Sequence, residues 1–249
     1  MTPDAALAFL LDGPMQSWGT SSRFQRRSTD AFPSKNGVLG LIAAAMGIDK
    51  HGTDEPERLK HLAALHFSVH RLPRLVRGEP TPVLRLRDYH TVGGGYDENT
   101  DSWARLSITR KASGGPSDNA VLTQRDYLTD AVFVVVLQGP RPLLGEIAAR
   151  LADPVWGVWL GRKCCVPAVP LLGCTGDDPI TAMKQLITLA QRGAAEDGHG
   201  SEWSYGEPTM TARDLVKGET AAPEDGADTR ADQPLSYGQR RYATRTIRS

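Results

Sequence analysis

Two continuous apolar segments, Ala5–Leu11 and Ala131–Leu137, constrain the fold of this sequence more than any other feature. A strand with one face in water alternates apolar and polar side chains, whereas a strand covered on both faces is apolar throughout. Neither segment alternates, so the sequence predicts a sheet with two central strands that are buried on both faces. Ala5–Leu11 is also too short to span a membrane or to form the apolar part of a signal peptide, so we expect a cytoplasmic protein without membrane contact.

Helical and strand-like segments surround the two apolar segments. Ser34 is the expected N-cap of the first helix, and Gly47 is the residue expected to end it. The expected strands cover 5–11, 66–77 and 131–137, and a strand and turn are expected over 156–173. The expected helices cover 37–46, 56–65, 142–151 and 180–191. The order strand, helix, strand, strand, helix, strand is that of a ferredoxin-like or RRM-like body. The predicted fold class is therefore α+β.

An insertion and a C-terminal extension accompany this body. Val83–Val92 alternates apolar and basic side chains and precedes a glycine-rich polar stretch, so residues 78–127 are predicted to form an inserted β-hairpin thumb. Residues 195–234 contain ten Asp and Glu against three Lys and Arg, which predicts an irregular, solvated segment. The expected domains are an RRM-like body over 1–77 and 128–192, the thumb over 78–127, and an acidic loop region with a basic C-terminal strand over 193–249.

The charge of the chain is balanced in total but unevenly distributed. Lys plus Arg and Asp plus Glu both number 29, so the protein is not expected to bind nucleic acid over its whole surface. Basic residues gather in Gln16–Gly37, Gly161–Lys163 and Gly238–Ser249. Arg binds phosphates and stacks on bases, so these segments predict one local groove for an anionic partner. The alternative is that they are scattered surface charges.

The turn Phe32–Gly37 is a second indication of a phosphate site. It opens the first predicted helix, where free backbone amides favour an anion, and Lys35 lies beside them. The turn does not match the Walker A pattern, so nucleotide hydrolysis is not predicted. An ordinary capped helix is the alternative interpretation of this turn.

Candidate catalytic residues are few. The histidines lack metal-ligand spacing, and Cys164, Cys165 and Cys174 form neither a zinc pattern nor a disulfide framework, so we expect reduced, packed thiols. Tyr89 and His90 are the pair best suited to metal-free acid–base chemistry on an RNA 2′-hydroxyl. The more favoured interpretation is that they pack on, or stack against, a ligand.

Six segments of the chain follow one another in the order found in a known family. They are Gly13–Gly19, Phe32–Leu41, Leu86–Val92, Arg125–Leu137, Trp159–Gly173 and Arg240–Ile247. With these segments the sequence resembles the CasD family, the RAMP-superfamily subunits of type I-E CRISPR Cascade that bind the 5′ handle of the guide RNA. The resemblance implies an RRM-like body with a thumb-like arm, which agrees with the insertion predicted from the residues.

The resemblance also implies partners and a role. The implied partners are the CRISPR guide RNA, through its 5′ handle, the large CasA subunit and the CasC backbone subunit. Target DNA would be bound by the assembled complex through guide pairing. A separate endonuclease, CasE, cuts the RNA in this lineage, so we expect a non-catalytic chain. The alternative is a metal-free endoribonuclease that processes CRISPR repeat RNA, for which Tyr89, His90 and Lys111 supply the residue types.

We therefore predict an RNA-binding surface without catalytic residues, metal ligands or a cofactor. Basic side chains and the amides of the first helix would meet the phosphates, and an aromatic side chain would stack on a splayed base. Trp18 is as well suited to the core as to stacking. The predicted RNA-binding residues are Gln16, Trp18, Arg26, Arg27, Ser34, Lys35, Asn36, Arg85, Arg87, Tyr89, His90, Arg162 and Lys163.

Overall fold

The computed structural model of the chain describes residues 4–19, 25–93, 120–196, 203–208, 210–215, 227–239 and 241–248. Its main sheet has seven strands in the order β10–β1–β9–β4–β12–β14–β13, and all neighbours in it are antiparallel. These strands are β1 (Ala5–Asp12), β4 (His66–Arg71), β9 (Val132–Gly139), β10 (Gly173–Gly176), β12 (Met210–Leu215), β13 (Ala227–Ser236) and β14 (Arg241–Arg248). The helices of the described part are α1 (Lys35–Ala45), α2 (Glu55–Ala63), α4 (Arg141–Ala152) and α5 (Pro179–Glu196). None of these helices is long and apolar enough to cross a membrane.

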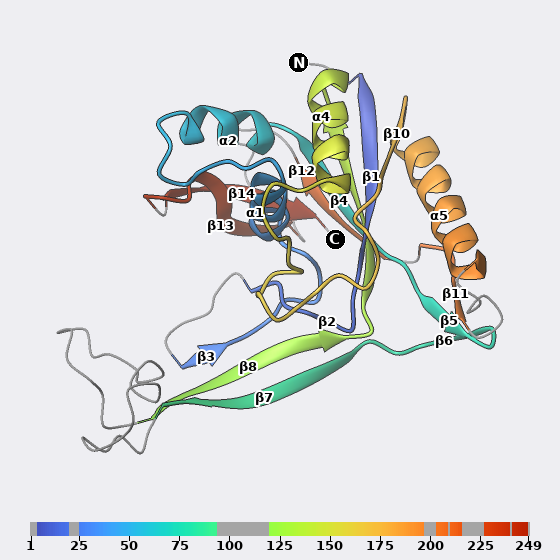
Figure 1. Cartoon of the computed structure of the whole chain (residues 1–249), viewed down its shortest axis with the longest axis horizontal. Helices are drawn as coiled ribbons and strands as arrows, with labels where there is room; N and C mark the ends of the chain where they lie inside the picture. The colour runs from blue at the N-terminus through green and yellow to red at the C-terminus, as the bar shows by residue number, and fades with distance from the viewer. Residues whose placement is uncertain are drawn as a thin grey trace.

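The central strands β1 and β9 are buried on both faces, as the two apolar segments predicted. All eight residues of β1 are buried. Leu7 and Phe9 belong to the core shared with α1, α2 and α4, whereas Ala8 and its neighbours on the other face pack with residues of α5. Figure 1 shows α1, α2 and α4 on one side of β1 and α5 on the other. The sheet is therefore the middle layer of three.

The first helix begins and ends where the sequence predicted. Ser34 is the N-cap of α1, and its Oγ accepts a hydrogen bond from the Gly37 amide at 3.2 Å. Gly47 follows the helix with φ of 66°, a left-handed conformation that glycine adopts without strain. The expected helices 56–65, 142–151 and 180–191 correspond to α2, α4 and α5.

Two predicted segments differ from the structure. A strand and a turn were expected over 156–173, and the strand is wrong, because the chain between α4 and β10 is irregular and only Gly173 is in a strand. Three prolines in 154–170 explain the difference, since proline has no amide hydrogen to donate to a sheet. The irregular segment predicted over 195–234 is wrong in part, because it contains β11 (Trp203–Tyr205), β12 and most of β13. Pairing of β12 with the edge of β4 overrides a composition that is poor in strand-forming residues.

The inserted segment forms a long hairpin. β7 (Leu84–Val92) pairs with β8 (Val121–Thr129) from Leu84 opposite Thr129 to Val92 opposite Val121. The other edge of β8 pairs with β2 (Met15–Gln16) and, in parallel, with β3 (Arg26–Arg27). Figure 1 shows β7 and β8 running together away from the main sheet. We call this hairpin the arm; its expected tip, 94–119, lies outside the described residues.

A buried carboxylate joins a small third sheet to the body. This sheet contains β11, β5 (Arg74–Val76) and β6 (Glu79–Pro80). Asp12, at the end of β1, forms an ion pair with Arg74 and accepts a hydrogen bond from the Tyr205 hydroxyl at 2.7 Å. Burial and the neighbouring Asp12 charge raise the pKa of Tyr205. The hydroxyl therefore stays a donor at every physiological pH.

Candidate nucleic-acid interface

The base of the arm brings together segments that lie far apart in the sequence. Arg26 and Arg27 of β3 lie opposite Gln124 and Arg125 of β8, and the Gln124 amide donates to the Gln25 carbonyl at 2.8 Å. The side chains of Arg26 and Arg27 are exposed. This pairing places a basic segment from the N-terminal part of the chain along the arm.

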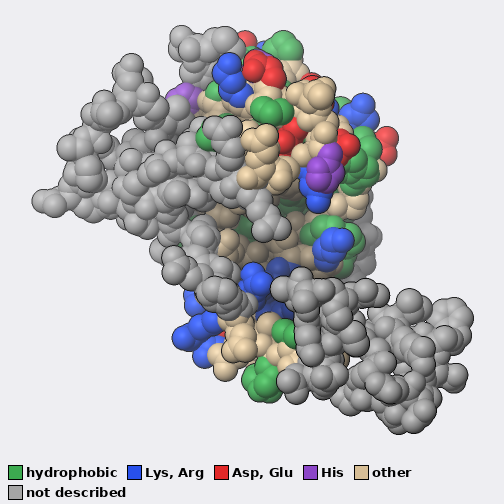
Figure 2. Space-filling view, turned by 90° about the vertical axis from the view of Figure 1, so that its left-hand side faces the viewer, with side chains coloured by type: hydrophobic (Ala, Val, Ile, Leu, Met, Phe, Trp, Pro, Cys, Tyr) green, Lys and Arg blue, Asp and Glu red, His purple; other side chains and the backbone are tan. Residues whose placement is uncertain are grey.

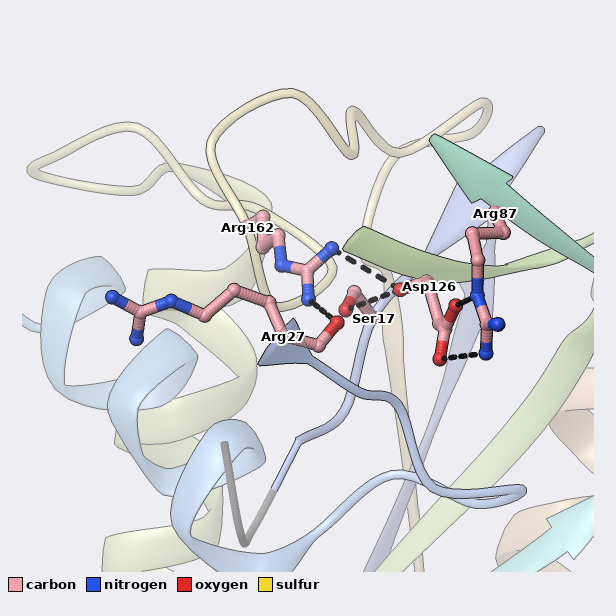
Figure 3. Close-up of polar contacts among 5 residues, drawn as sticks. All are labelled: Ser17, Arg27, Arg87, Asp126 and Arg162. Atoms are coloured by element: carbon pink, nitrogen blue, oxygen red, sulfur yellow. Dashed lines mark hydrogen bonds and ion pairs between the residues drawn. The ribbon is translucent and has the colours of Figure 1, made fainter. Parts of the chain in front are cut away.

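Arg162 connects this basic edge to the turn before β10. Its Nη2 donates to the Arg27 carbonyl at 2.6 Å and its Nη1 to the Asp126 carbonyl at 3.1 Å (Figure 3). The guanidinium also lies over the Tyr127 ring, 4.7 Å from its centroid. A planar guanidinium can make these contacts at once because its donors form a rigid fork. Arg162 therefore holds β3 against β8.

Asp126 provides a fixed negative charge beneath the basic surface. The carboxylate is buried and forms a two-point ion pair with Arg87, at 2.8 Å to Nε and 3.3 Å to Nη2 (Figure 3). Hydrogen bonding from Arg87 holds the pKa of the Asp126 carboxyl below its usual range, and the charges of Arg85 and Arg26 act in the same direction. The same contact raises the pKa of Arg87. The Asp126 carboxylate thus orients Arg87 and lies among arginines whose total charge exceeds its own.

The turn that carries Arg162 is fixed by a close backbone approach. Gly161 has φ of 96°, and a Cβ at this position would lie 1.8 Å from the Ser17 carbonyl oxygen. The Ser17 amide donates to the Leu160 carbonyl at 3.0 Å, and its hydroxyl to the Asp126 carbonyl at 3.2 Å. Only glycine fits this crossing, since any side chain would overlap the backbone of Ser17.

Two hollows lie along this surface. The proximal hollow has a volume of about 320 Å³ and is lined by Ser17, Trp18, Gly19, Arg27, Ser28, Ser34, Asn36, Gly37, Gly161 and Arg162. The arm hollow, of about 330 Å³, is lined by Gln25, Arg26, Tyr89, Leu122, Thr123 and Gln124. Figure 2 shows Lys and Arg side chains gathered around the hollowed middle of one face of the molecule. Together these features form a basic surface with room for an anionic polymer.

Comparison with known proteins identifies the family to which the chain belongs. A family model described as CRISPR-associated protein (Cas_Cas5) matches residues 6–248. The chain belongs to this Cas5 family. The resemblance predicted from the sequence segments is therefore confirmed.

Individual relatives agree with this assignment. The "CRISPR system Cascade subunit CasD" of Escherichia coli (strain K12) is 31% identical over 182 residues, which cover 71% of this chain and 75% of the relative. A chain in a solved "CRISPR RNA-guided surveillance complex" has a TM-score of 0.63 at 30% identity, over 98% of this chain and 88% of that chain. A second structure, "Crystal structure of Cas protein", gives a TM-score of 0.54 at 26% identity, over 98% and 92% of the two chains. The Cas5-family chain is thus a homologue of CasD.

Three predicted RNA contacts are buried in this Cas5-family fold. Lys35 is 1% exposed, and its Nζ donates to the carbonyls of Ala63 and Leu65, each at 3.0 Å. Trp18 is also 1% exposed, and its indole nitrogen donates to the Gln16 side chain. Gln16 is fully buried, and its side-chain Nε2 donates to the backbone carbonyls of Leu11 and Ala131. Lys35 and Gln16 thus have backbone carbonyls as partners inside the protein, and Trp18 is the core residue that the alternative described.

The hydroxyl of Ser34 also has a hydrogen-bond partner within the protein. Ser34 is 5% exposed, and its Oγ holds the Gly37 amide, so this amide is not free for a phosphate. The interpretation of Phe32–Gly37 as a capped helix is confirmed. A buried lysine in the first turn of a helix cannot be recognised from composition, because its partners are carbonyls at the far end of α2.

The other predicted contacts lie on or beside the basic surface of the Cas5-family chain. The side chains of Arg26, Arg27, Arg85, Arg87, Tyr89 and Lys163 are exposed, and those of Asn36, His90 and Arg162 are half-buried. Their role in RNA binding stays a prediction. Sequence reasoning missed Ser17, Arg125, Asp126 and Tyr127, although all four fall in the segments that carry the family resemblance.

The described part of the chain gives little support for metal binding or for chemistry at the cysteines. It contains no group of three or more side chains suited to holding a metal ion. All three cysteines are unpaired; Cys165 is buried, and burial raises its pKa to about 12. Cys164 is exposed, so the expectation that all the thiols are packed is wrong for this residue.

Proposed function

We propose that this Cas5-family chain is a non-catalytic, cytoplasmic RNA-binding subunit of a CRISPR Cascade surveillance complex. In this proposal it caps the 5′ handle of the guide RNA and docks the large CasA subunit and the CasC backbone subunit. Target DNA is then read by the guide within the assembled complex. Family membership and the CasD homologue support the complex, and the basic surface at the base of the arm supports the contact with RNA.

The finer description of the fold belongs to the same proposal. The strand order β10–β1–β9–β4, with α1 and α2 before β4 and α4 before β10, supports a ferredoxin-like body. The arm supports the thumb. The face of the sheet that RRM domains use for stacking is covered by α5, so RNA would bind at the base of the arm instead.

The observation that carries the RNA contact is the pairing of β3 with β8, which places the exposed Arg26 and Arg27 beside the buried Asp126 and its partner Arg87. β3 and β8 are paired, and the charges of Arg26 and Arg87 both act on this carboxylate. Exposed arginines held at fixed spacing would bind successive phosphates with little further ordering.

The geometry of Tyr89 and His90 supports a non-catalytic role. Neighbouring residues in a strand point to opposite faces, and Tyr89 is 63% exposed whereas His90 is half-buried. An acid and a base for cleavage must converge on one 2′-hydroxyl. These two side chains diverge from one another.

A salt titration tests the RNA contact. Arg26→Ala combined with Arg27→Ala should weaken binding of labelled repeat RNA and flatten the dependence of log K on log salt concentration by about 0.7–1.4. The control is Arg150→Ala with Arg192→Ala, which removes the same charge from exposed positions on α4 and α5. An unchanged slope in the first variant would contradict the proposed contact.

A cleavage assay tests the non-catalytic role. The purified chain should bind the repeat RNA without cutting it, in the presence and absence of EDTA. Cleavage that persists in EDTA and disappears in His90→Ala would instead establish a metal-free endoribonuclease.

A further inference from the structure

Arg26 and Arg27 are neighbours in the sequence but belong to opposite faces of the arm sheet. Successive side chains of a strand alternate between its faces, and directly paired residues of adjacent strands share a face. Arg26 is paired with Gln124 and Arg27 with Arg125, so the two arginines lie on different faces. Accordingly, Arg27 lines the proximal hollow, whereas Arg26 lines the arm hollow. The two hollows are therefore separate sites.

Three exposed residues form a row across the strands on the Arg26 face. Gln124 of β8 is paired with Arg26 of β3 on one side and with Tyr89 of β7 on the other. All three side chains are exposed, and Tyr89 has 63% of its surface in solvent. The next row on the same face is the ion pair of Asp126 with Arg87. The row of Arg26, Gln124 and Tyr89 thus lies on a paired and braced part of the sheet.

This row supplies the three kinds of contact that a nucleotide requires. An exposed aromatic ring can stack on the face of a base. A side-chain amide both donates and accepts hydrogen bonds, as the edge of a base does, and glutamine pairs with adenine in this way. A guanidinium binds phosphate. The arm hollow is lined by all of these side chains and by the exposed Leu122, which adds apolar surface.

The charge and the size of the arm hollow indicate the class of ligand. Arg26, Arg85 and Arg87 share this face with the single carboxylate of Asp126, so the face carries a net positive charge. That charge favours an anionic polymer. A volume of about 330 Å³ lies at the small end of the range for small-molecule sites, which suits one base better than a run of stacked bases.

We infer that the arm hollow binds one unpaired base of an RNA strand. The ring of Tyr89 stacks on the face of this base, Gln124 forms hydrogen bonds to its edge, and Arg26 binds a flanking phosphate. Gln124, which is not among the RNA contacts predicted from the sequence, is then a specificity-determining residue. This inference rests on the proposed binding of RNA.

The test compares rA8 with an abasic octamer that keeps the ribose phosphates but has no bases, each labelled for fluorescence anisotropy. Tyr89→Leu in the full chain should weaken binding of rA8 about five- to 150-fold, the range for one stacked base. Tyr89→Phe should bind rA8 as the parent does, because phenylalanine keeps the ring. Neither variant should change binding of the abasic octamer.

Two further substitutions separate the contact with the base from the contact with the phosphate. Gln124→Leu should weaken binding of rA8 about two- to tenfold, the range for one hydrogen bond, and leave the abasic octamer unaffected. Its control is Gln185→Leu, at an exposed position on α5. Arg26→Gln should weaken binding of both octamers and flatten the salt dependence by about 0.7. Because the substituted side chains are exposed, the melting temperatures should stay within about 2 °C of the parent.

Two outcomes would overturn the stacking of Tyr89. One is parent-like binding of rA8 by Tyr89→Leu. The other is an equal loss on rA8 and on the abasic octamer, since Tyr89 would then support the sheet and not a base. In the same way, a Gln124→Leu protein with unchanged affinity for rA8 would overturn the role of Gln124.

The failure of this inference is distinguishable from failure of the proposed function. A parent chain that binds rA8 no more tightly than the abasic octamer would overturn the base site, while RNA binding through phosphates would stand. A parent chain that binds neither octamer nor the repeat RNA would overturn the proposed RNA binding, and the inference with it.

Discussion

Removal of Arg162 should separate its role in the fold from the phosphate contact that the sequence predicted. In the structure its guanidinium bonds to the carbonyls of Arg27 and Asp126 and lies over the ring of Tyr127. Arg162→Ala loses all three contacts, whereas Arg162→Lys keeps the charge but cannot reach both carbonyls with a planar fork.

The magnitude follows from these contacts. Each hydrogen bond from a half-buried cation contributes about 1 kcal/mol once water can replace it, and the contact with the ring contributes about 0.5–1 kcal/mol. Arg162→Ala should therefore lower the free energy of unfolding by about 2–3 kcal/mol and the melting temperature by about 5–10 °C. Arg162→Lys should lose about half of this amount.

Thermal unfolding followed by circular dichroism measures this effect, with Arg150→Ala as the control for loss of an exposed arginine. A salt titration of RNA binding should accompany it. If Arg162→Ala melts at the temperature of the parent and reduces the salt slope by about one phosphate contact, the side chain binds RNA and does not hold β3 to β8.

Three further substitutions or conditions test other parts of the structure. Gly161→Ala should destabilise the protein by about 3 kcal/mol or more in chemical denaturation, because its Cβ would overlap the Ser17 carbonyl at 1.8 Å. Glu55→Ala should cost about 2–4 kcal/mol, since the buried carboxylate accepts three hydrogen bonds from residues 236–238. The ion pair of Asp126 with Arg87 should make stability depend on pH below about 4. The lowered pKa of Asp126 means that this stabilisation is present above the ordinary carboxyl pKa and is lost as the pH falls through the folded value.

Each of these expectations has a clear contrary result. Parent-like stability of Gly161→Ala would show that the turn can move away from Ser17. A Glu55→Ala protein that unfolds at the same denaturant concentration as the parent would show that residues 236–238 are not held through α2. For Asp126, the comparison is with Asp126→Asn. If the parent loses no more stability than this variant between pH 6 and pH 3, the ion pair contributes nothing.

The body of the fold could be predicted because its signals are local. Apolar segments identified β1 and β9, and the Ser34 cap with Gly47 fixed the limits of α1. The strands after residue 200 could not be predicted, because β12 depends on the edge of β4 and not on its own composition. The same reasoning applies to β3, whose two residues form a strand only because β8 lies beside them.

The positive charge of the site could be predicted from the sequence, but the directions in which its side chains point could not. Exposed arginines were recognised from their clustering, whereas the fate of Lys35 depended on the carbonyls that end α2. Charge alone cannot distinguish a lysine that meets solvent from one that bridges two helices. Asp126 was overlooked because a single acid in a strand has no sequence signature.

The basic surface is assembled from residues 17–19, 25–37, 124–127 and 161–163, and this has a thermodynamic consequence. A ligand that binds only the assembled surface must stabilise the entire fold by mass action. RNA at a hundred times its Kd would add about 2.7 kcal/mol to the free energy of unfolding. If the chain binds the guide as proposed, we therefore expect correctly folded chains to retain the guide and incorrectly folded chains to lose it.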